Sequence, residues 1–194
     1  MKRLSAIATV VVVAACNWGP SPTDAVDALI EAIAARDSVA IARHADIARV
    51  AESSVDPLIE AAAMMSELGM TGPGGQSGAM AVQMLEQFRP MLAPLMEQMF
   101  WQMLLDPESF RRGPFAGILG GETFAFDRIS EAYRGVAYER KDENDRRIVG
   151  IDLSSEADSS NVVELVMERG EDTWQMVGFV DLAGKIEEMI ETQR

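Results

Sequence analysis

Two of the residue types that most often do chemistry occur once each in this chain. Cys16 is its only cysteine and His44 its only histidine. A metal site built from nitrogen and sulfur ligands needs three or four such side chains, and we find no convincing cysteine- or serine-based catalytic triad. We therefore predict no metal, no cofactor and no set of catalytic residues. His44, on an expected short helix with an apolar side, is either a general base or ligand, or a structural residue.

Two short runs have the composition of ligand-binding loops but lack their patterns. Asp142-Glu143-Asn144-Asp145 is rich in carboxylates, but it lacks the glycine and the distal glutamate of a calcium-binding helix–loop–helix. It lies between Lys141 and Arg146, so we expect a solvated hairpin turn. Gly120-Gly121 is not followed by the lysine and the serine or threonine of a phosphate-binding loop, and we expect an ordinary loop there.

The first residues have the pattern of an export signal. Lys2 and Arg3 precede an apolar run over residues 4–15, and Cys16 follows directly. The run is shorter than the roughly 20 residues that a membrane-spanning helix needs. A basic start, a short apolar stretch and small residues at a cleavage site are typical of a secretory signal. Residues 1–15 are therefore expected to be a signal peptide.

The end of this signal, Val13-Ala14-Ala15-Cys16, resembles the lipobox of bacterial lipoproteins, with valine where leucine is usual. The resemblance implies that the Cys16 thiol receives diacylglycerol, that the peptide is cut before it, and that the new amine is often acylated, as with palmitate. Two or three acyl chains anchor a protein stably, whereas one is marginal. Asn17, where an aspartate would retain such proteins in the inner membrane, implies the periplasmic face of the outer membrane. Residues 16–23 then form a lipidated, proline-containing tether.

The chain is acidic. Its formal net charge is −14, and the loss of Lys2 and Arg3 with the signal would make it −16. This charge gives no electrostatic route to nucleic acid or to anionic lipid surfaces. The remaining length suffices for one domain that buries about two-thirds of its unfolded surface. We predict that single domain over residues 24–194.

Methionine is concentrated in residues 79–105, where large apolar side chains recur at helical spacing. The stripe consists of Met80, Met84, Phe88, Met91, Leu95, Met99 and Met103. Pro90 and Pro94 lie inside it and predict two helices or one kinked helix, divided near Pro90. The glycine-rich stretch 69–78 before it predicts a flexible linker or mobile loop. Methionine is adaptable, so the stripe either lines or covers a pocket for an acyl chain, meets a partner protein, rests on the membrane, or packs on the domain's own core. Few cations argue against the membrane, since Arg89 is the only one in the segment.

Helices are expected before this segment. Ser21-Pro22-Thr23-Asp24 has the pattern of a helix start, with a capping serine and proline at the first position. Asp37 is expected to cap a second short helix. Residues 46–53 and 57–68 predict two more.

From about Phe124 the apolar period becomes strand-like, and strands are expected at 129–139, 147–154, 161–169 and 173–179. Short polar turns between neighbouring strands indicate an antiparallel meander. An apolar stripe from Leu182 to Ile190 predicts a closing helix. Helices first and a four-stranded antiparallel sheet last predict an α+β fold.

Two stretches carry a resemblance to known domains: EAIAARDSVAIARHADIARV near the start and VVELVMERGEDTWQMVGFVDL near the end. They are similar to a family of uncharacterised bacterial envelope domains that begin with helix, Arg-Asp turn and helix, and end in a meander with a tryptophan-containing strand. The arrangement also looks like the nuclear-transport-factor-2-like, or cystatin-like, superfold, in which a curved sheet wraps a long helix. The resemblance covers about half the chain and leaves residues 69–122, approximately, as a helical insertion. That superfold hosts many functions, so it does not decide this one.

Ketosteroid-isomerase-like enzymes of this superfold use an acid or a tyrosine in the cone of the sheet, so Tyr133, Tyr138 and Asp152 are the positions to inspect. The two tyrosines have opposite parity on the expected strand unless a bulge at Gly135 brings them to one face. Packing explains them better, because no polar set stands beside them.

Our leading prediction is therefore a non-catalytic, lipid-anchored periplasmic binding or accessory module. It would use the Met-rich stripe to hold an apolar ligand or an envelope protein. The alternatives are a small hydrolase or isomerase with its site in the cone, or a dimerisation scaffold.

Overall fold

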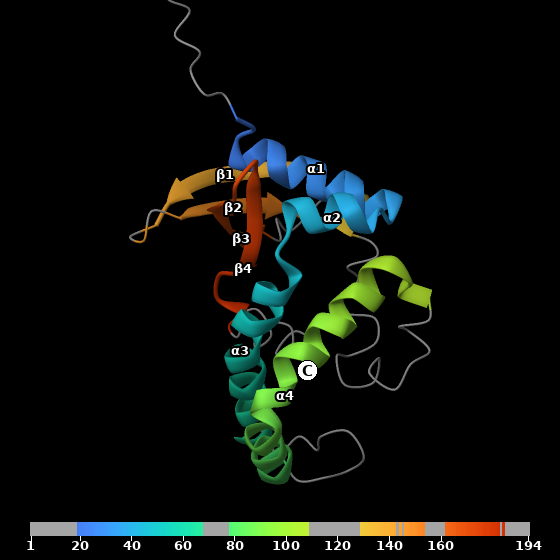
Figure 1. The fold of residues 1–194 in the computed structure, drawn as a ribbon. Coiled ribbons are helices and arrows are strands. Elements are labelled where there is room, and N and C mark those ends of the chain that lie inside the picture. Colours follow the sequence, from blue (N-terminus) through green and yellow to red (C-terminus); the bar gives the residue numbers. More distant parts are fainter. Residues whose placement is uncertain are drawn as a thin grey trace, which may run out of the picture.

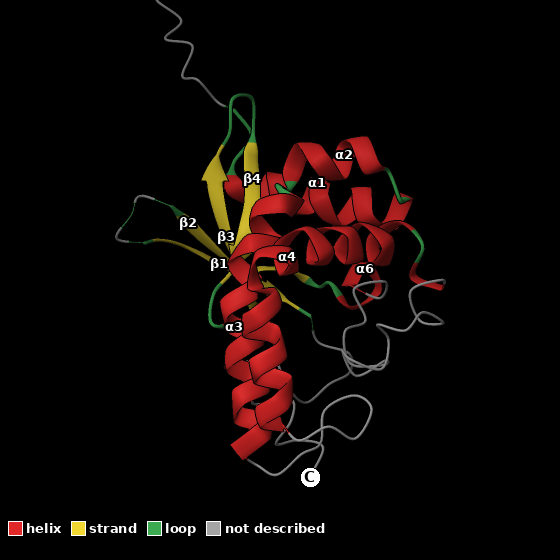
Figure 2. Cartoon of the chain, turned by 60° about the horizontal axis from the view of Figure 1, so that its bottom comes forward, coloured by secondary structure: helices red, strands yellow, loops and turns green. Residues whose placement is uncertain are grey.

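The computed structural model describes residues 19–67, 78–108, 129–153 without 143 and 145, and 162–184 without 183. The expected signal, Cys16 and Gly120-Gly121 lie outside this part of the chain, as does the glycine-rich stretch apart from Gly78. Helices come first and an antiparallel four-stranded sheet last (Figure 1), which confirms the predicted α+β class. Figure 2 shows α1 and α2 beside the sheet, with the α3–α4 pair extending away from it.

The first two helices begin where the capping residues predict. In α1 (Pro22–Ala35), the Ser21 hydroxyl accepts from the Asp24 backbone N–H and the Asp24 carboxylate accepts from the Ser21 N–H, which completes a capping box. Asp37 caps α2 (Ser38–His44), because its carboxylate accepts from the backbone N–H groups of Val39 and Ala40. Between them Arg36 ends α1 in the left-handed conformation, with φ of 54°. The Arg36-Asp37 turn is thus present.

The third helix is continuous where two were expected. Helix α3 (Ile47–Glu67) includes Pro57, which removes one backbone hydrogen bond without ending the helix. Its first half packs against the edge strand of the sheet and the remainder against α4. Because both halves bury apolar side chains on these neighbours, tertiary packing outweighs the local cost of the proline. The prediction of separate helices at 46–53 and 57–68 was wrong.

The Met-rich segment is also one helix, α4 (Gly78–Leu105), with Pro90 and Pro94 inside it. Figure 1 shows that it changes direction along its length, first running beside α3 and then leaning away from it to end below α1 and α2. This is the second of the two predicted forms, one kinked helix.

The first expected strand, 129–139, was wrong at its beginning. Residues Ile129–Ala132 form the short helix α6, closed by a hydrogen bond of 2.8 Å from the Tyr133 N–H to the Ile129 carbonyl. Strand β1 (Gly135–Lys141) then starts at a glycine with φ of 128°, a conformation that other residues rarely adopt. The alternation of apolar and polar residues that predicts this strand extends back through Ile129–Ala132, but the same residues fit a helical turn equally well.

The sheet is a meander in the order β1-β2-β3-β4, with every neighbouring pair antiparallel, as predicted. The other strands are β2 (Arg147–Asp152), β3 (Val162–Arg169) and β4 (Trp174–Phe179), close to the expected ranges. In the β1–β2 turn the Asp142 carboxylate accepts from the Asn144 and Arg146 backbone N–H groups, the hairpin turn expected there. Of the expected closing helix, Leu182 and Gly184 are described and helical.

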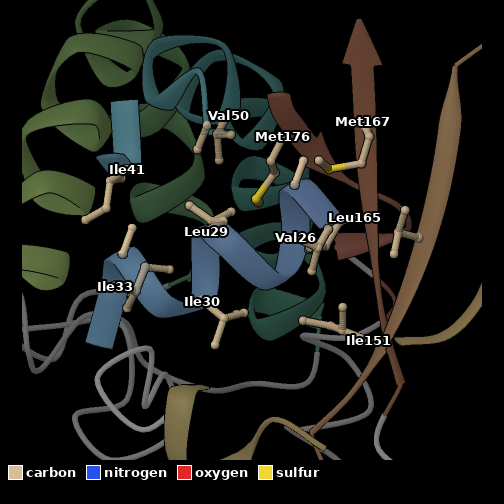
Figure 3. Close-up of a cluster of buried hydrophobic side chains, with 14 of the residues drawn as sticks. Val26, Leu29, Ile30, Ile33, Ile41, Val50, Ile151, Leu165, Met167 and Met176 are labelled. Atoms are coloured by element: carbon tan, nitrogen blue, oxygen red, sulfur yellow. The ribbon is translucent and has the colours of Figure 1, made fainter. Parts of the chain in front are cut away.

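The main core lies between α1 and one face of the sheet (Figure 3). Val26, Leu29 and Ile33 of α1 are buried at the helical spacing that the sequence shows. They meet Ile151 of β2 and Met167 of β3, both fully buried. The sheet therefore presents its alternating apolar residues to this helix.

Candidate functional site

The α3–α4 hairpin is held together by one side of each helix. Its apolar cluster has Val55, Ile59 and Leu92 at the centre, with Leu85, Ala93 and Met96 packed against them. At the edge of the cluster, Arg89 forms ion pairs with Asp56 of α3 and, at 3.3 Å, with Glu86 of its own helix. These contacts place the Leu92 side of α4 against α3.

Most of the predicted stripe lies beside this contact, on the exposed surface of α4. We use the term Met-rich row for five of its residues, whose exposed fractions are 53% for Met80, 42% for Met84, 46% for Phe88, 66% for Met91 and 39% for Leu95. Single exposed apolar residues are ordinary, but a contiguous row of large ones marks an interaction surface. The alternative that the whole stripe packs on the domain's own core does not hold for these five.

The last two residues of the stripe lie elsewhere. Met99 is partly buried and Met103 is buried, with 3% exposed. A helix turns about 100° per residue, so each four-residue step overshoots a full turn by about 40°. Three such steps separate Met91 from Met103, which brings Met103 about 120° round the helix and into the core. The stripe is therefore a surface at one end and core at the other.

The neighbours of the Met-rich row are polar but uncharged. Gln87, Gln98 and Gln102 are exposed along it. The charged residues of the described helix are Glu86, Arg89 and Glu97, which lie off the row at this helical spacing. The row is thus an apolar surface with an uncharged border.

A small cavity of about 40 Å³ lies where the end of α4 meets the core. Its described lining is entirely apolar and includes Leu29 of α1, Met103 of α4 and Met176 of β4. An apolar cavity that accepts a molecule as small as benzene is about 150 Å³. An acyl chain would therefore have to displace side chains to enter.

The two tyrosines considered for catalysis lie apart. Tyr133 packs against the main core and donates a hydrogen bond to Asp27 of α1. Burial, and then this hydrogen bond, raise the pKa of Tyr133 well above its usual value. Tyr138 lies on the other face of the sheet, over Gly150, and donates to Glu164 at 2.7 Å. A register shift between Val136 and Tyr138 is present in β1, but Tyr133 precedes the strand, so the bulge does not bring the tyrosines together.

Nor does the described lining of the small cavity offer an acid or base. Asp152 ends β2, and its backbone carbonyl accepts from the Arg134 N–H at 2.9 Å. The cavity lining within the described residues contributes no polar side chain. Among the same residues no group of three or more histidine, cysteine, aspartate or glutamate side chains is placed to hold a metal.

His44 ends α2 in a partly buried position, and its buried Nδ1 has no hydrogen-bond partner among the described residues. Burial, and then the nearby Arg43 charge, lower the pKa of His44. A neutral imidazole with one unpaired nitrogen fits a packing position, and it faces no described acid that would make it a base.

The described chain begins at a contact that sequence reasoning missed. A side-chain carbon at Gly19 would lie only 2.5 Å from the Arg169 guanidinium, so the missing side chain permits a close approach. The same guanidinium lies over the Trp174 ring, 5.7 Å from its centre. Arg169 and Trp174 are paired across the β3–β4 hairpin. The approach of Gly19 has no signal in the sequence.

Searches against protein-family models, curated proteins and solved structures find no match to this chain. Within the described residues, no helix is long and apolar enough to cross a membrane.

Proposed function

We propose that this chain is a lipid-anchored protein of the bacterial outer membrane, facing the periplasm, and that its α+β domain is a non-catalytic binding module. The Met-rich row would hold another envelope protein, and Cys16 would carry the lipid. The observation that carries the proposal is the exposure of five large apolar side chains along α4, beside its contact with α3.

A protein partner fits this surface better than an enclosed apolar ligand does. The row lies on the outside of a helix, whereas ligand pockets are concave and bury most of the ligand. The cavity at the other end of the stripe measures about 40 Å³, too small for an acyl chain. Flexible methionines suit a surface that adapts to a partner.

The test uses the full chain in its native envelope, with a photo-crosslinking amino acid in place of Gln87, which borders the row. We expect a protein adduct that disappears when Met84, Phe88, Met91 and Leu95 are all replaced by glutamine. The same crosslinker at Glu60, an exposed residue of α3, is the matched control and should give no such adduct. The fourfold variant should keep its thermal unfolding transition, because its side chains are exposed.

Two results would contradict the proposal. An adduct that persists in the fourfold variant would show that the row does not bind. Loss of the folded state in that variant would show that the row is core. A lipid adduct at Gln87 would instead favour the apolar-ligand form of the prediction.

A further inference from the structure

We infer that the domain stands with its β3–β4 hairpin next to the membrane that holds Cys16, and that the α3–α4 hairpin carries the Met-rich row away from that membrane, toward an apolar helix of a second envelope protein. The inference rests on the proposed lipid anchor and deepens it, because it states which end of the domain meets the bilayer.

The start of the described chain is attached to the β3–β4 end of the sheet. Gly19 lies against the Arg169 guanidinium, which in turn lies over Trp174. Four residues on, the Thr23 hydroxyl donates to the Glu139 carboxylate of β1 at 3.3 Å. The chain therefore enters the domain along the sheet and not along the α3–α4 hairpin.

The distance from this attachment to the anchor is short. Three residue steps separate Cys16 from Gly19, and an extended chain covers about 3.3–3.6 Å per residue. Gly19 thus lies within about 10 Å of an acylated Cys16. The turn at Gly170 that joins β3 to β4 is then close to the lipid headgroups.

The α3–α4 hairpin extends away from this attachment, and the Met-rich row runs back along it from near its tip. Helix α3 leaves the sheet where the Asp46 N–H bonds to the Met176 carbonyl at 2.9 Å. Its 21 residues extend about 30 Å at 1.5 Å per residue. Figures 1 and 2 both show the tip of the hairpin opposite the start of α1. Met80 and Met84, close to the start of α4, lie near that tip, and Met91 and Leu95 lie further back along the helix.

Charge opposes the arrangement in which the domain lies flat and rests the row on its own membrane. The chain has a strongly negative net charge, and anionic headgroups repel such a surface. In the described part of α4 the cation is Arg89, which is already paired with Asp56 and Glu86. Helices that lie on membranes carry lysine and arginine on their polar face.

The spacing within the row indicates that a helix of the partner protein packs against it. Met84, Phe88, Met91 and Leu95 alternate steps of four and three residues, the repeat by which one helix packs along another. Obligate homodimer interfaces run above about 2,000 Å², far more than five side chains supply, whereas transient contacts between different proteins are at the small end of the range. The row therefore fits one apolar helix of a different protein better than a second copy of this chain.

Fluorescence energy transfer to labelled headgroups tests the orientation without any partner. The full lipidated protein is placed in vesicles of phosphatidylethanolamine and phosphatidylglycerol, with a single added cysteine as Asp172→Cys or Met91→Cys. Acylation blocks the only native thiol, so the dye reports the added position alone. We expect stronger transfer from position 172 than from position 91. Transfer from position 91 equal to or above that from 172 overturns the inference.

Two variants sharpen the measurement. Glu60→Cys places the dye on the α3 side of the same hairpin and should also give weaker transfer than position 172. Transfer there equal to or above that from position 172 would mean that the domain lies flat on α3. Arg169→Ala removes the contact that holds Gly19, and we expect the difference between positions 172 and 91 to shrink. An unchanged difference would refute the role of this contact.

The identity of the partner that contacts the Met-rich row is tested by mapping the Gln87 crosslink by mass spectrometry. A crosslinked peptide from a helix of another envelope protein supports the choice, and a peptide from a second copy of this chain overturns it. A wrong orientation and a wrong proposed function would give different results. The energy-transfer result needs no partner, whereas the crosslink needs no particular orientation.

Discussion

Met103 and Met91 offer a matched pair for testing which end of the Met-rich stripe is core. Both are methionines of α4, but Met103 is 3% exposed and Met91 is 66% exposed. Replacing Met103 by alanine removes three buried heavy atoms, worth about 0.8 kcal/mol each in transfer free energy. The space left behind adds about 24 cal/mol for each Å³ that does not collapse.

The existing cavity makes collapse at Met103 harder. Met103 already borders about 40 Å³ of apolar space, so truncation enlarges a hole that the surrounding side chains do not fill. We expect Met103→Ala to lower the free energy of unfolding by about 3–4 kcal/mol, within the range for buried methionine. The melting temperature should fall by about 6–16 °C. Met91→Ala should change the free energy of unfolding by no more than about 0.5 kcal/mol.

Urea unfolding of the full chain in detergent, followed by circular dichroism, measures both variants. The reasoning requires a large fall in the midpoint for Met103→Ala and an unchanged slope, because the same surface unfolds in each case. Equal losses for the two variants would refute it, since the row would then be buried. A neutral Met103→Ala would place that side chain outside the core.

Three further predictions follow from the caps, the histidine and the anchor. Ser21→Ala removes half of the capping box with Asp24 and should cost about 1 kcal/mol in thermal or urea unfolding, whereas a cost near zero would show that the box is not formed in solution. Burial lowers the pKa of His44 in the folded state below its usual 6.5. The unfolded state therefore binds the proton more readily than the folded state does. The contribution of His44 to stability is thus complete above pH 6.5 and declines as the pH falls below it. Unfolding measured between about pH 7.5 and 5.5 should therefore show a steeper loss for the native chain than for His44→Gln, and identical slopes would contradict this. Cys16→Ser should leave the precursor uncleaved and without radioactive palmitate, and normal processing would refute the lipid anchor.

The sequence alone determined the elements whose ends are marked locally. Ser21 and Asp37 announce helix starts because their side chains satisfy free backbone N–H groups a few residues on. The meander was predictable for a similar reason, since alternation in β2 and β3 assigns one face to the core. The resemblance to the nuclear-transport-factor-2-like superfold stays a prediction.

Tertiary structure decided the points where local rules compete with packing. Pro57 is compatible with a break, but contacts with α4 favour a continuous helix. Residues 129–132 are compatible with a strand, but their contacts with the core favour a helical turn. The same holds for the Met-rich stripe. Spacing places its residues on one side of a helix. It does not show which part of that side faces the rest of the protein. Leu92 packs against α3 and Met103 lines the apolar cavity at the core. Met91 lies on neither contact and is exposed.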